Sequence, residues 1–173
     1  MGLLFSKRRE LSGKRVLLTG ASSGIGRELA KQLAAANARQ VLLARSEDTL
    51  HELRSELGEQ ACEVVAGDVT DHSARAAALQ RATDAYGGLD LLINNAGAGA
   101  YGRFTEVSSE RLRTLMEVNL FAPAELIREA APLLAAGEDS AVVNIGSILG
   151  CRGLPFSSEY CASKFALHGL SEA

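Results

Sequence analysis

Short apolar runs alternate with longer segments of helical spacing along almost the whole chain, and this alternation limits the folds that it can adopt. The apolar runs span residues 15–19, 40–44, 61–65, 89–93 and 140–145. Continuous apolar runs of this length are typical of strands buried on both faces of a parallel sheet. The helical segments span residues 24–36, 46–57 with Ser46 as N-cap, 71–86 with Asp71 as N-cap, 108–136, and a last one from about Ser157. This order predicts an α/β fold, a doubly wound parallel sheet with helices on both faces.

The composition allows one domain. The chain has 173 residues, of which 47% are hydrophobic, enough for one sizeable core but not for two full domains. We expect residues 1–13 to form a leader and residues 14–173 to form the domain. The net charge of −3 and the lack of a long basic run argue against nucleic acid as a partner. The three cysteines are scattered, so they predict no metal site, and they favour a cytoplasmic protein with reduced, buried thiols. They are Cys62, Cys151 and Cys161.

The first nine residues carry two features of a membrane anchor. Residues 1–6 fit the pattern for N-myristoylation of Gly2, and the basic residues Lys7, Arg8 and Arg9 follow directly. One acyl chain holds a membrane only marginally, so an adjoining basic cluster is the second signal that anchoring requires. The pattern is short and arises by chance, and no apolar run reaches membrane-spanning length. We therefore favour an unanchored leader, with membrane association through Gly2 as the alternative.

A glycine-rich turn joins the first predicted strand to the first predicted helix. Its glycine spacing differs from the G-x-G-x-x-G fingerprint, but it lies where a dinucleotide-binding motif must lie. Glycines there let backbone N–H groups approach a pyrophosphate at the helix N-terminus. A glycine-rich turn that only separates the strand from the helix and binds no ligand is the alternative. We predict that residues 14–173 form a dinucleotide-binding domain whose turn holds the cofactor through Gly20, Ser22, Ser23, Gly24, Ile25 and Gly26.

The choice of cofactor is expected at the end of the second strand, about 20 residues further on. An acidic residue there would bind the ribose 2′-hydroxyl of NAD, but this chain has Arg45 and Ser46, which suit the 2′-phosphate of NADP. A solvated arginine is the alternative. Asp68 could accept a hydrogen bond from the adenine amino group or could simply be a turn residue, and Val69, which follows it, is also a predicted cofactor contact. The remaining predicted cofactor contacts are small residues that keep the crevice open after the fourth strand, Asn95, Ala96 and Gly97.

Tyr160 and Lys164 are four residues apart in the last helical segment, so they lie one turn apart on one face. A phenol titrates near ~10 and is a poor proton donor or acceptor at neutral pH. A neighbouring ammonium favours the phenolate and turns such a phenol into a working acid or base. Pairs of this kind are also common on solvated helix faces. The spacing therefore indicates an acid/base pair only in combination with the cofactor motifs.

Asn119 lies on the apolar stripe of its helical segment, where a buried amide must find hydrogen-bond partners. Pro123, four residues later, cannot donate to the carbonyl of Asn119. We therefore expect a kink at this point that leaves the carbonyl free to bind a water. An incidental kink beside a satisfied core asparagine is the alternative.

In this order, the turn 19–26, Asp68, the segment 94–97, Asn119, Ser147, Tyr160 and Lys164 closely resemble the motifs of the short-chain dehydrogenase/reductase family. The resemblance, to the family's single-domain Rossmann-type form, extends from residue 14 to residue 173. It implies an NADP-dependent oxidoreductase that interconverts a small-molecule carbonyl and its alcohol, with NAD as the less favoured cofactor.

The resemblance also implies a role for each catalytic residue. Tyr160 would pass a proton to or from the substrate oxygen and would also contact the cofactor. Lys164 would assist the tyrosine and bind the nicotinamide ribose, and Ser147 would hold and polarise the carbonyl. A water at Asn119 would continue the proton relay that leads to the lysine.

Members of the family continue past this point with another parallel strand, a segment that covers the substrate, and a final helix and strand. We therefore expect a C-terminally truncated domain in which the strand 140–145 is an exposed edge. The family often forms homo-oligomers through the helices after the fourth and fifth strands, and the full-length protein is expected to do so. A non-catalytic NADP-binding module, or an inactive fragment of a reductase, is the alternative to an enzyme.

Overall fold

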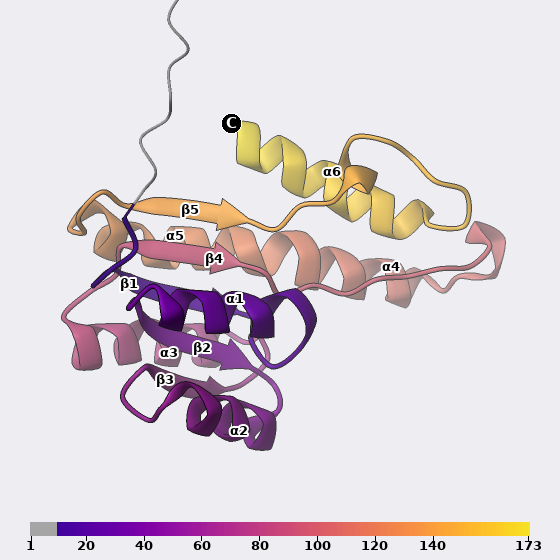
Figure 1. The fold of residues 1–173 in the computed structure, drawn as a ribbon. Helices are drawn as coiled ribbons and strands as arrows, with labels where there is room; N and C mark the ends of the chain where they lie inside the picture. Colours follow the sequence, from indigo (N-terminus) through magenta and orange to yellow (C-terminus); the bar gives the residue numbers. More distant parts are fainter. Residues whose placement is uncertain (1–9) are drawn as a thin grey trace, which may run out of the picture.

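Five parallel strands form one sheet in the computed structural model of the protein, which describes residues 10–173 (Figure 1). The central strand is β1, whose Leu17 pairs with Val41 on one side and with Leu92 on the other. The predicted lipidation site at Gly2 and the basic run 7–9 lie outside the described residues. In their order across the sheet the strands are β3 (Cys62–Ala66), β2 (Arg39–Ala44), β1 (Arg15–Thr19), β4 (Leu91–Asn94) and β5 (Ala141–Asn144).

Helices connect the strands and cover both faces of the sheet, which confirms the predicted doubly wound α/β fold. They are α1 (Gly24–Ala35), α2 (Glu47–Leu57), α3 (His72–Tyr86), α4 (Ser109–Met116), α5 (Ala122–Ala135) and α6 (Ser158–Glu172). Two short 3-10 helices, η1 (Phe104–Glu106) and η3 (Ile148–Gly150), lie after β4 and β5. Ser46 and Asp71 occupy the predicted N-cap positions, but neither side chain makes a capping hydrogen bond. The hydroxyl of Ser46 instead lies 2.7 Å from that of Thr49.

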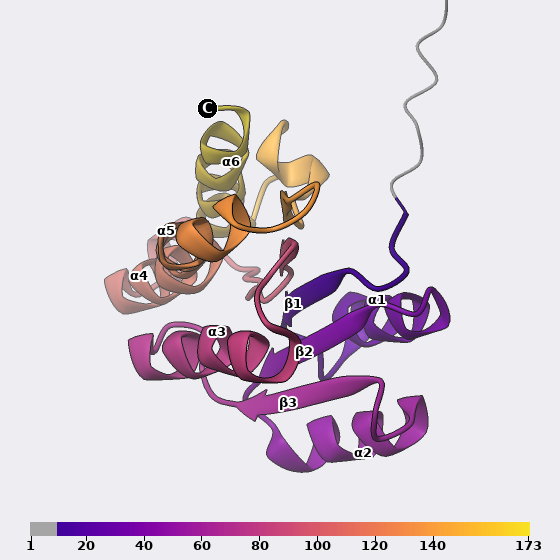
Figure 2. The ribbon, with the colours of Figure 1, turned by 90° about the vertical axis from the view of Figure 1, so that its left-hand side faces the viewer.

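Two separate apolar cores lie on the two faces of the sheet, beneath the helices that Figure 2 shows on either side of it. Leu18 belongs to the core that α1 and α2 cover, and its neighbour Leu17 belongs to the core that α3 and α5 cover. Successive strand side chains point to opposite faces, so a run of apolar residues supplies both cores. No residue of α6 belongs to either described core. The two cores thus join the sheet to α1, α2, α3 and α5, whereas α4 and α6 lie outside them.

The predicted helix over residues 108–136 is interrupted in the middle. A π-helical turn, η2 (Glu117–Phe121), separates α4 from α5, and the N–H of Ala122 bonds to the carbonyl of Glu117, five residues back. Pro123 lies in the first turn of α5, where its missing N–H breaks the ladder of α-helical hydrogen bonds. The interruption predicted at Asn119 is present, and it takes the form of a π-helical turn.

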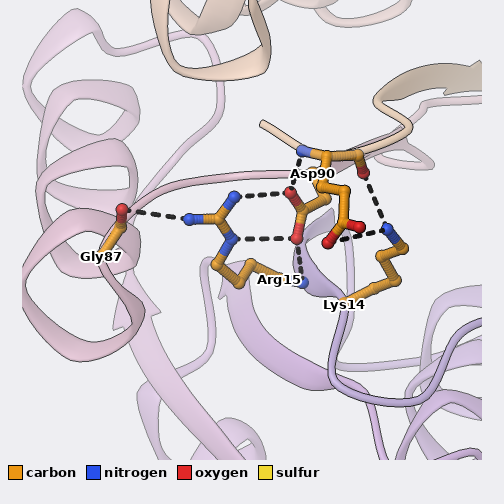
Figure 3. A network of polar contacts seen from close by, with 5 residues as sticks. Lys14, Arg15, Gly87 and Asp90 are labelled. Carbon is orange, nitrogen blue, oxygen red and sulfur yellow. Dashed lines mark hydrogen bonds and ion pairs between the residues drawn. The ribbon is translucent and has the colours of Figure 1, made fainter. Parts of the chain in front are cut away.

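Asp90 ties together the N-terminal ends of three strands (Figure 3). Its carboxylate accepts from the backbone N–H of Arg15 at 3.0 Å, from Arg15 Nε at 2.9 Å, and from the backbone N–H of Glu138 at 2.8 Å. Arg15 also donates to the carbonyl of Gly87, and Lys14 Nζ donates to the carbonyl of Glu138. Hydrogen bonds from the Arg15 side chain hold the pKa of Asp90 well below its usual range. This network closes the end of the sheet opposite the strand C-termini.

β5 is an edge strand with poorly covered faces. Within residues 10–173 it pairs only with β4, and Val142 and Val143 expose 37% and 40% of their surface. α6 lies away from the sheet, alongside α4 and η2 (Figure 1). The predicted exposed edge is therefore present in the described part of the chain.

The three cysteines are free, and two of them are buried. Burial raises the pKa of the Cys62 thiol to about 11. The prediction of a buried thiol is wrong for Cys151, which is exposed because it follows η3 in the loop after the edge strand.

Candidate active site

A cleft of about 360 Å³ opens at the C-terminal ends of the central strands. It lies where the chain leaves β1 between β2 and β4, the switch point at which doubly wound sheets bind ligands. Three predicted cofactor residues, Ser46, Tyr160 and Lys164, do not line it. The predicted residues that the structure brings together in the cleft are Gly20, Ser22, Ser23, Gly24, Ile25, Gly26, Arg45, Asp68, Val69, Asn95, Ala96 and Gly97.

The glycine-rich turn requires glycine at two positions for different reasons. Gly20 has a φ of +67°, in the left-handed region that disfavours residues with a Cβ. A Cβ at Gly26 would collide with the carbonyl oxygen of Gly20. The turn can therefore fold back on itself and present its backbone to the cleft.

Asn95 and Thr19 hold this turn against the end of β4. Asn95 Nδ2 donates to the carbonyls of Thr19 and Gly20 at 2.9 and 3.1 Å. Thr19 Oγ1 accepts from the backbone N–H groups of Asn95 and Ala96 at 3.1 and 3.0 Å. The Asn95 side chain therefore supports the wall of the cleft through the backbone.

The N-terminus of α1 opens onto the cleft through Gly24, Ile25 and Gly26. The first turn of α1 contains no acidic residue, and its N-cap Ser23 makes no side-chain capping hydrogen bond. The positive end of the helix dipole is thus not neutralised by a local carboxylate. These features fit the diphosphate of a dinucleotide.

Arg45 and Asp68 face each other across another part of the cleft. Arg45 Nη1 is 4.0 Å from Asp68 Oδ2, and the Arg45 side chain is 83% exposed. Asp68 Oδ1 accepts from the N–H and the hydroxyl of Thr70 at 2.9 and 2.8 Å. Asp68 is therefore both a turn residue and a cleft residue, whereas Ser46 points its hydroxyl at Thr49.

Lys164 connects the cleft with α6. Its side chain is buried, and Nζ donates to the carbonyl of Ile145, just after β5, at 2.9 Å. Burial lowers the pKa of this ammonium group. A Cβ built on Gly97, which lines the cleft, would lie 3.9 Å from Lys164 Nζ. The amino group therefore lies at the rim of the cleft.

Tyr160 and Ser147 lie at the same end of the sheet as the cleft. Tyr160 is partly buried one turn before Lys164, whose Nζ is 5.9 Å from the centroid of the tyrosine ring. Ser147 is the N-cap of η3, and its Oγ accepts from the N–H of Leu149 at 3.1 Å. A serine hydroxyl that accepts in this way still has its O–H to donate. Two hydroxyls and an ammonium group thus lie at this end of the sheet.

Asn119 is fully buried in η2, and its amide is satisfied by hydrogen bonds. Oδ1 accepts from the N–H of Ala98, and Nδ2 donates to the carbonyl of Ala98, both at 2.8 Å. Nδ2 also donates to Ser163 Oγ at 2.9 Å. The side chain therefore matches the alternative interpretation, a satisfied core asparagine. Binding of a water by its carbonyl stays a prediction.

Five further residues line the cleft although no sequence motif singles them out. Ala44 ends a predicted strand, and Gly67 and Ala98 come after predicted strands, so their position was a usable signal. Val118 lies in the π-helical turn, which no local pattern specifies. The five are Leu43, Ala44, Gly67, Ala98 and Val118.

Within residues 10–173, no group of three or more His, Cys, Asp and Glu side chains is placed to hold a metal ion. No helix in that part of the chain combines the length and the apolarity needed to cross a bilayer.

Comparison with known sequences agrees with this geometry. The family model described as short chain dehydrogenase matches residues 14–173. Hydroxysteroid 11-beta-dehydrogenase 1-like protein of Xenopus tropicalis is 38% identical over 163 residues, which are 92% of this chain and 57% of that protein. Dehydrogenase/reductase SDR family member 7B of Bos taurus is 38% identical over 160 residues, 87% of this chain and 49% of that protein. The chain thus spans about half the length of these curated relatives.

Solved structures show the same fold. A short-chain dehydrogenase from Streptomyces avermitilis superimposes with a TM-score of 0.87 at 37% identity, over 93% of this chain and 59% of that one. L-Sorbose reductase from Gluconobacter frateurii, solved in complex with NADPH and L-sorbose, superimposes with a TM-score of 0.89 at 32% identity, over 95% of this chain and 64% of that one.

Proposed function

We propose, since this chain belongs to the short-chain dehydrogenase family, that it is an NADPH-dependent oxidoreductase that reduces a small-molecule carbonyl or oxidises the corresponding alcohol. The observation that carries the proposal is the position of Lys164. Its buried amino group lies at the rim of the dinucleotide cleft and one helical turn from Tyr160. This position supports a proposal in which a cofactor site and an acid/base pair lie next to each other.

The cleft would hold the diphosphate at the glycine-rich turn and the N-terminus of α1. When bound, the nicotinamide supplies the hydride. Gly97 and Lys164 would lie beside the nicotinamide ribose, because they are close to each other where the cleft ends. The protein's own contribution is then to orient the reactants and to move a proton.

Tyr160 would donate the proton to the carbonyl oxygen during reduction and accept it during alcohol oxidation. Lys164 keeps two N–H donors after its bond to Ile145, which suits it to support the phenol and to bind a ribose hydroxyl. Ser147 would donate its O–H to the same substrate oxygen and so favour the charge that develops there. Proton transfer from a positioned side chain of this kind contributes about 10²- to 10⁴-fold to a rate.

Preference for NADPH is supported by Arg45, whose exposed guanidinium lines the cleft at the end of β2. A guanidinium binds a phosphate through parallel hydrogen bonds and suits a ribose 2′-phosphate. The sorbose reductase with the same fold was solved with NADPH bound. NAD is the less favoured cofactor.

A non-catalytic NADP-binding module is the other function that the sequence allows. Such a module needs the cleft alone, and it has no use for a buried lysine beside a tyrosine at the rim. The same reasoning applies to an inactive fragment. Lipidation at Gly2, a cytoplasmic location and assembly into homo-oligomers stay predictions.

Replacement of Tyr160 by phenylalanine tests the enzyme proposal. We expect NADPH oxidation against a panel of ketones and aldehydes to fall at least about 100-fold in Tyr160→Phe, because the proton donor is lost. Binding of NADPH should remain, since Tyr160 does not line the cleft.

Tyr86→Phe is the matched control. It removes a phenol hydroxyl that donates to the carbonyl of Gln40, in the sheet and away from the cleft, and it should keep its turnover. Equal turnover of the parent protein and Tyr160→Phe would contradict the catalytic role of the tyrosine.

A further inference from the structure

A buried carboxylate lies directly before the tyrosine on α6. The side chain of Glu159 is 0% exposed, and Arg111 of α4 donates to its Oε1 from Nη2 at 2.9 Å and from Nε at 3.2 Å. Ser158 Oγ donates to Oε2 at 3.2 Å. A carboxylate withdrawn from water in this way requires a charged partner, so Arg111 joins α4 firmly to the first turn of α6.

A second polar link joins the next turn of α6 to the same helical stack. Asn119 Nδ2, in η2, donates to Ser163 Oγ at 2.9 Å. Ser163 Oγ in turn donates to the carbonyl of Tyr160 at 2.8 Å. The backbone around Tyr160 is therefore held from α4 on one side and from η2 on the other.

Arg111 also lies against the loop that follows β4. A Cβ built on Gly102 would lie 3.4 Å from Arg111 Nη2, and the N–H of Gly102 donates to the carbonyl of Phe156 at 2.8 Å. Phe156 lies in the segment that leads into α6, and its ring is 5.7 Å from that of Tyr101, centroid to centroid. One guanidinium thus bonds to the first turn of α6 and lies beside the loop that leads from β4.

These links matter because apolar packing holds α6 less than the helices that contribute to the cores, α1, α2, α3 and α5. α6 lies outside both apolar cores, and its main neighbours in the described part of the chain are η3, η2 and α4 (Figure 2). The adjacent strand β5 exposes valines on both faces. Directional polar contacts therefore have a larger share in setting the orientation of α6 than they have for α1, α2, α3 and α5, which contribute residues to the cores.

We propose that Arg111 and Glu159 are positioning residues that fix the first turn of α6, and so aim the Tyr160 hydroxyl at the substrate oxygen above the cofactor cleft. The inference rests on the proposed function, because it assigns the pair to the chemical step. It separates two tasks within the chain: the glycine-rich turn and Arg45 bind the cofactor, and the α4–α6 ion pair sets the geometry of proton transfer. Loss of the pair should then affect kcat and leave cofactor binding intact.

Steady-state kinetics of Arg111→Met test the proposal. We expect kcat to fall about 10- to 100-fold, the loss that a displacement of about 1 Å at a reacting group produces. The KM and Kd for NADPH should stay at the parent values. Because Arg111→Met leaves a buried charge without its partner, the double variant Arg111→Met/Glu159→Gln, which removes both charges, provides a second folded protein. It should show about the same loss of kcat as the single variant, since the two residues act as one unit.

Arg128→Met is the matched control. Arg128 Nη1 bonds to Glu125 Oε1 at 2.7 Å, in an arginine–glutamate ion pair whose arginine is 73% exposed and whose two residues both belong to α5. This variant should keep the parent kcat. Arg111→Lys, which keeps the charge but donates from one nitrogen, should recover part of the rate. Parent-like kcat in Arg111→Met and in the double variant would overturn the proposal, and so would a rise in the KM for NADPH that accounts for the whole loss.

Hydrogen–deuterium exchange gives a readout that does not depend on activity. The amides of residues 158–164 should exchange faster in Arg111→Met and in the double variant than in the parent or in Arg128→Met. If the parent fails to oxidise NADPH with any carbonyl but this exchange pattern is found, the link between α4 and α6 is supported and the proposed function fails. If turnover depends on Tyr160 but neither the exchange rates nor kcat change when the ion pair is removed, the proposed function stands and the positioning role fails.

Discussion

Arg45 is the residue on which the choice of cofactor most directly depends. It is highly exposed, so its replacement should cost little stability, and its partner Asp68 is 4.0 Å away. In Arg45→Asp we expect the Kd for NADPH to rise about 10- to 100-fold, because a charge-assisted bond to the 2′-phosphate is lost and a like charge faces the phosphate. The Kd for NADH should change much less. Fluorescence titration with both nucleotides measures the two constants.

Arg39→Asp is the appropriate comparison for this substitution. Arg39 is an exposed arginine at the other end of β2, remote from the cleft, so the same charge change there should leave both dissociation constants unaltered. An unchanged preference in Arg45→Asp would mean that another residue selects the nucleotide.

At the residue scale, the sequence identified most of the cleft because strand C-termini can be located from apolar runs. It could not identify what each polar side chain contacts. Asn95 supports the turn through backbone carbonyls, and Asn119 is paired with the backbone of Ala98. The Arg111–Glu159 pair joins residues 48 positions apart, so no local pattern reveals it. Such contacts depend on tertiary structure and appear only once the helices are placed.

At the element scale, Asp90 links the starting ends of β1, β4 and β5, as described above. We expect Asp90→Asn to lower the free energy of unfolding by about 2–4 kcal/mol at pH 7, because the substitution removes the largely buried carboxylate and leaves the Arg15 guanidinium without its ion-pair partner. Chemical denaturation of both proteins at several pH values measures the difference.

The pH dependence of this effect follows from the direction of the pKa shift. The folded-state pKa of Asp90 is lowered, so its contribution is fully present above the unfolded-state pKa of about 3.9 and is lost as the pH falls towards the folded-state value. The stability difference between the parent and Asp90→Asn should therefore shrink below about pH 4. Glu125→Gln, in an exposed ion pair, should show almost no difference at any pH. A difference for Asp90→Asn that persists at acid pH would contradict this account.

Element types followed from the sequence, because alternating apolar runs and helical periods are strong local signals. Helix interruptions and caps were less predictable. The position of Pro123 indicates an interruption, but the five-residue π-helical turn also depends on the bonds of Asn119 to Ala98, which lies 21 residues earlier. Ser46 has the right residue type for a cap, yet its hydroxyl faces that of Thr49.

At the scale of the whole molecule, both cores are complete without a ligand, so the chain should fold without nucleotide and gain stability from it. At a free NADPH concentration of about 100 times the Kd, binding adds about 2.7 kcal/mol. For a protein of this size that corresponds to a rise in Tm of about 5–10 °C. A thermal-shift titration with NADPH, and with NADH in parallel, measures it.

Gly26→Ala provides the negative control for the titration. Its methyl group would meet the carbonyl of Gly20, so the variant should lose most of the NADPH-induced shift. A shift that is equal for NADPH and NADH would count against the proposed preference. No shift with either nucleotide would count against the dinucleotide cleft itself.

The uncovered side of β5 has a consequence for how the molecule behaves in solution. Among residues 10–173, one row of amide and carbonyl groups of β5 pairs with no strand and lies beside two partly exposed valines, and such a row is a template for β-augmentation. Any extended segment that docks there completes a sixth strand and shields both valines at once. The segment that docks there can come from outside residues 10–173 or from a neighbouring molecule, and only the second source makes the association depend on concentration.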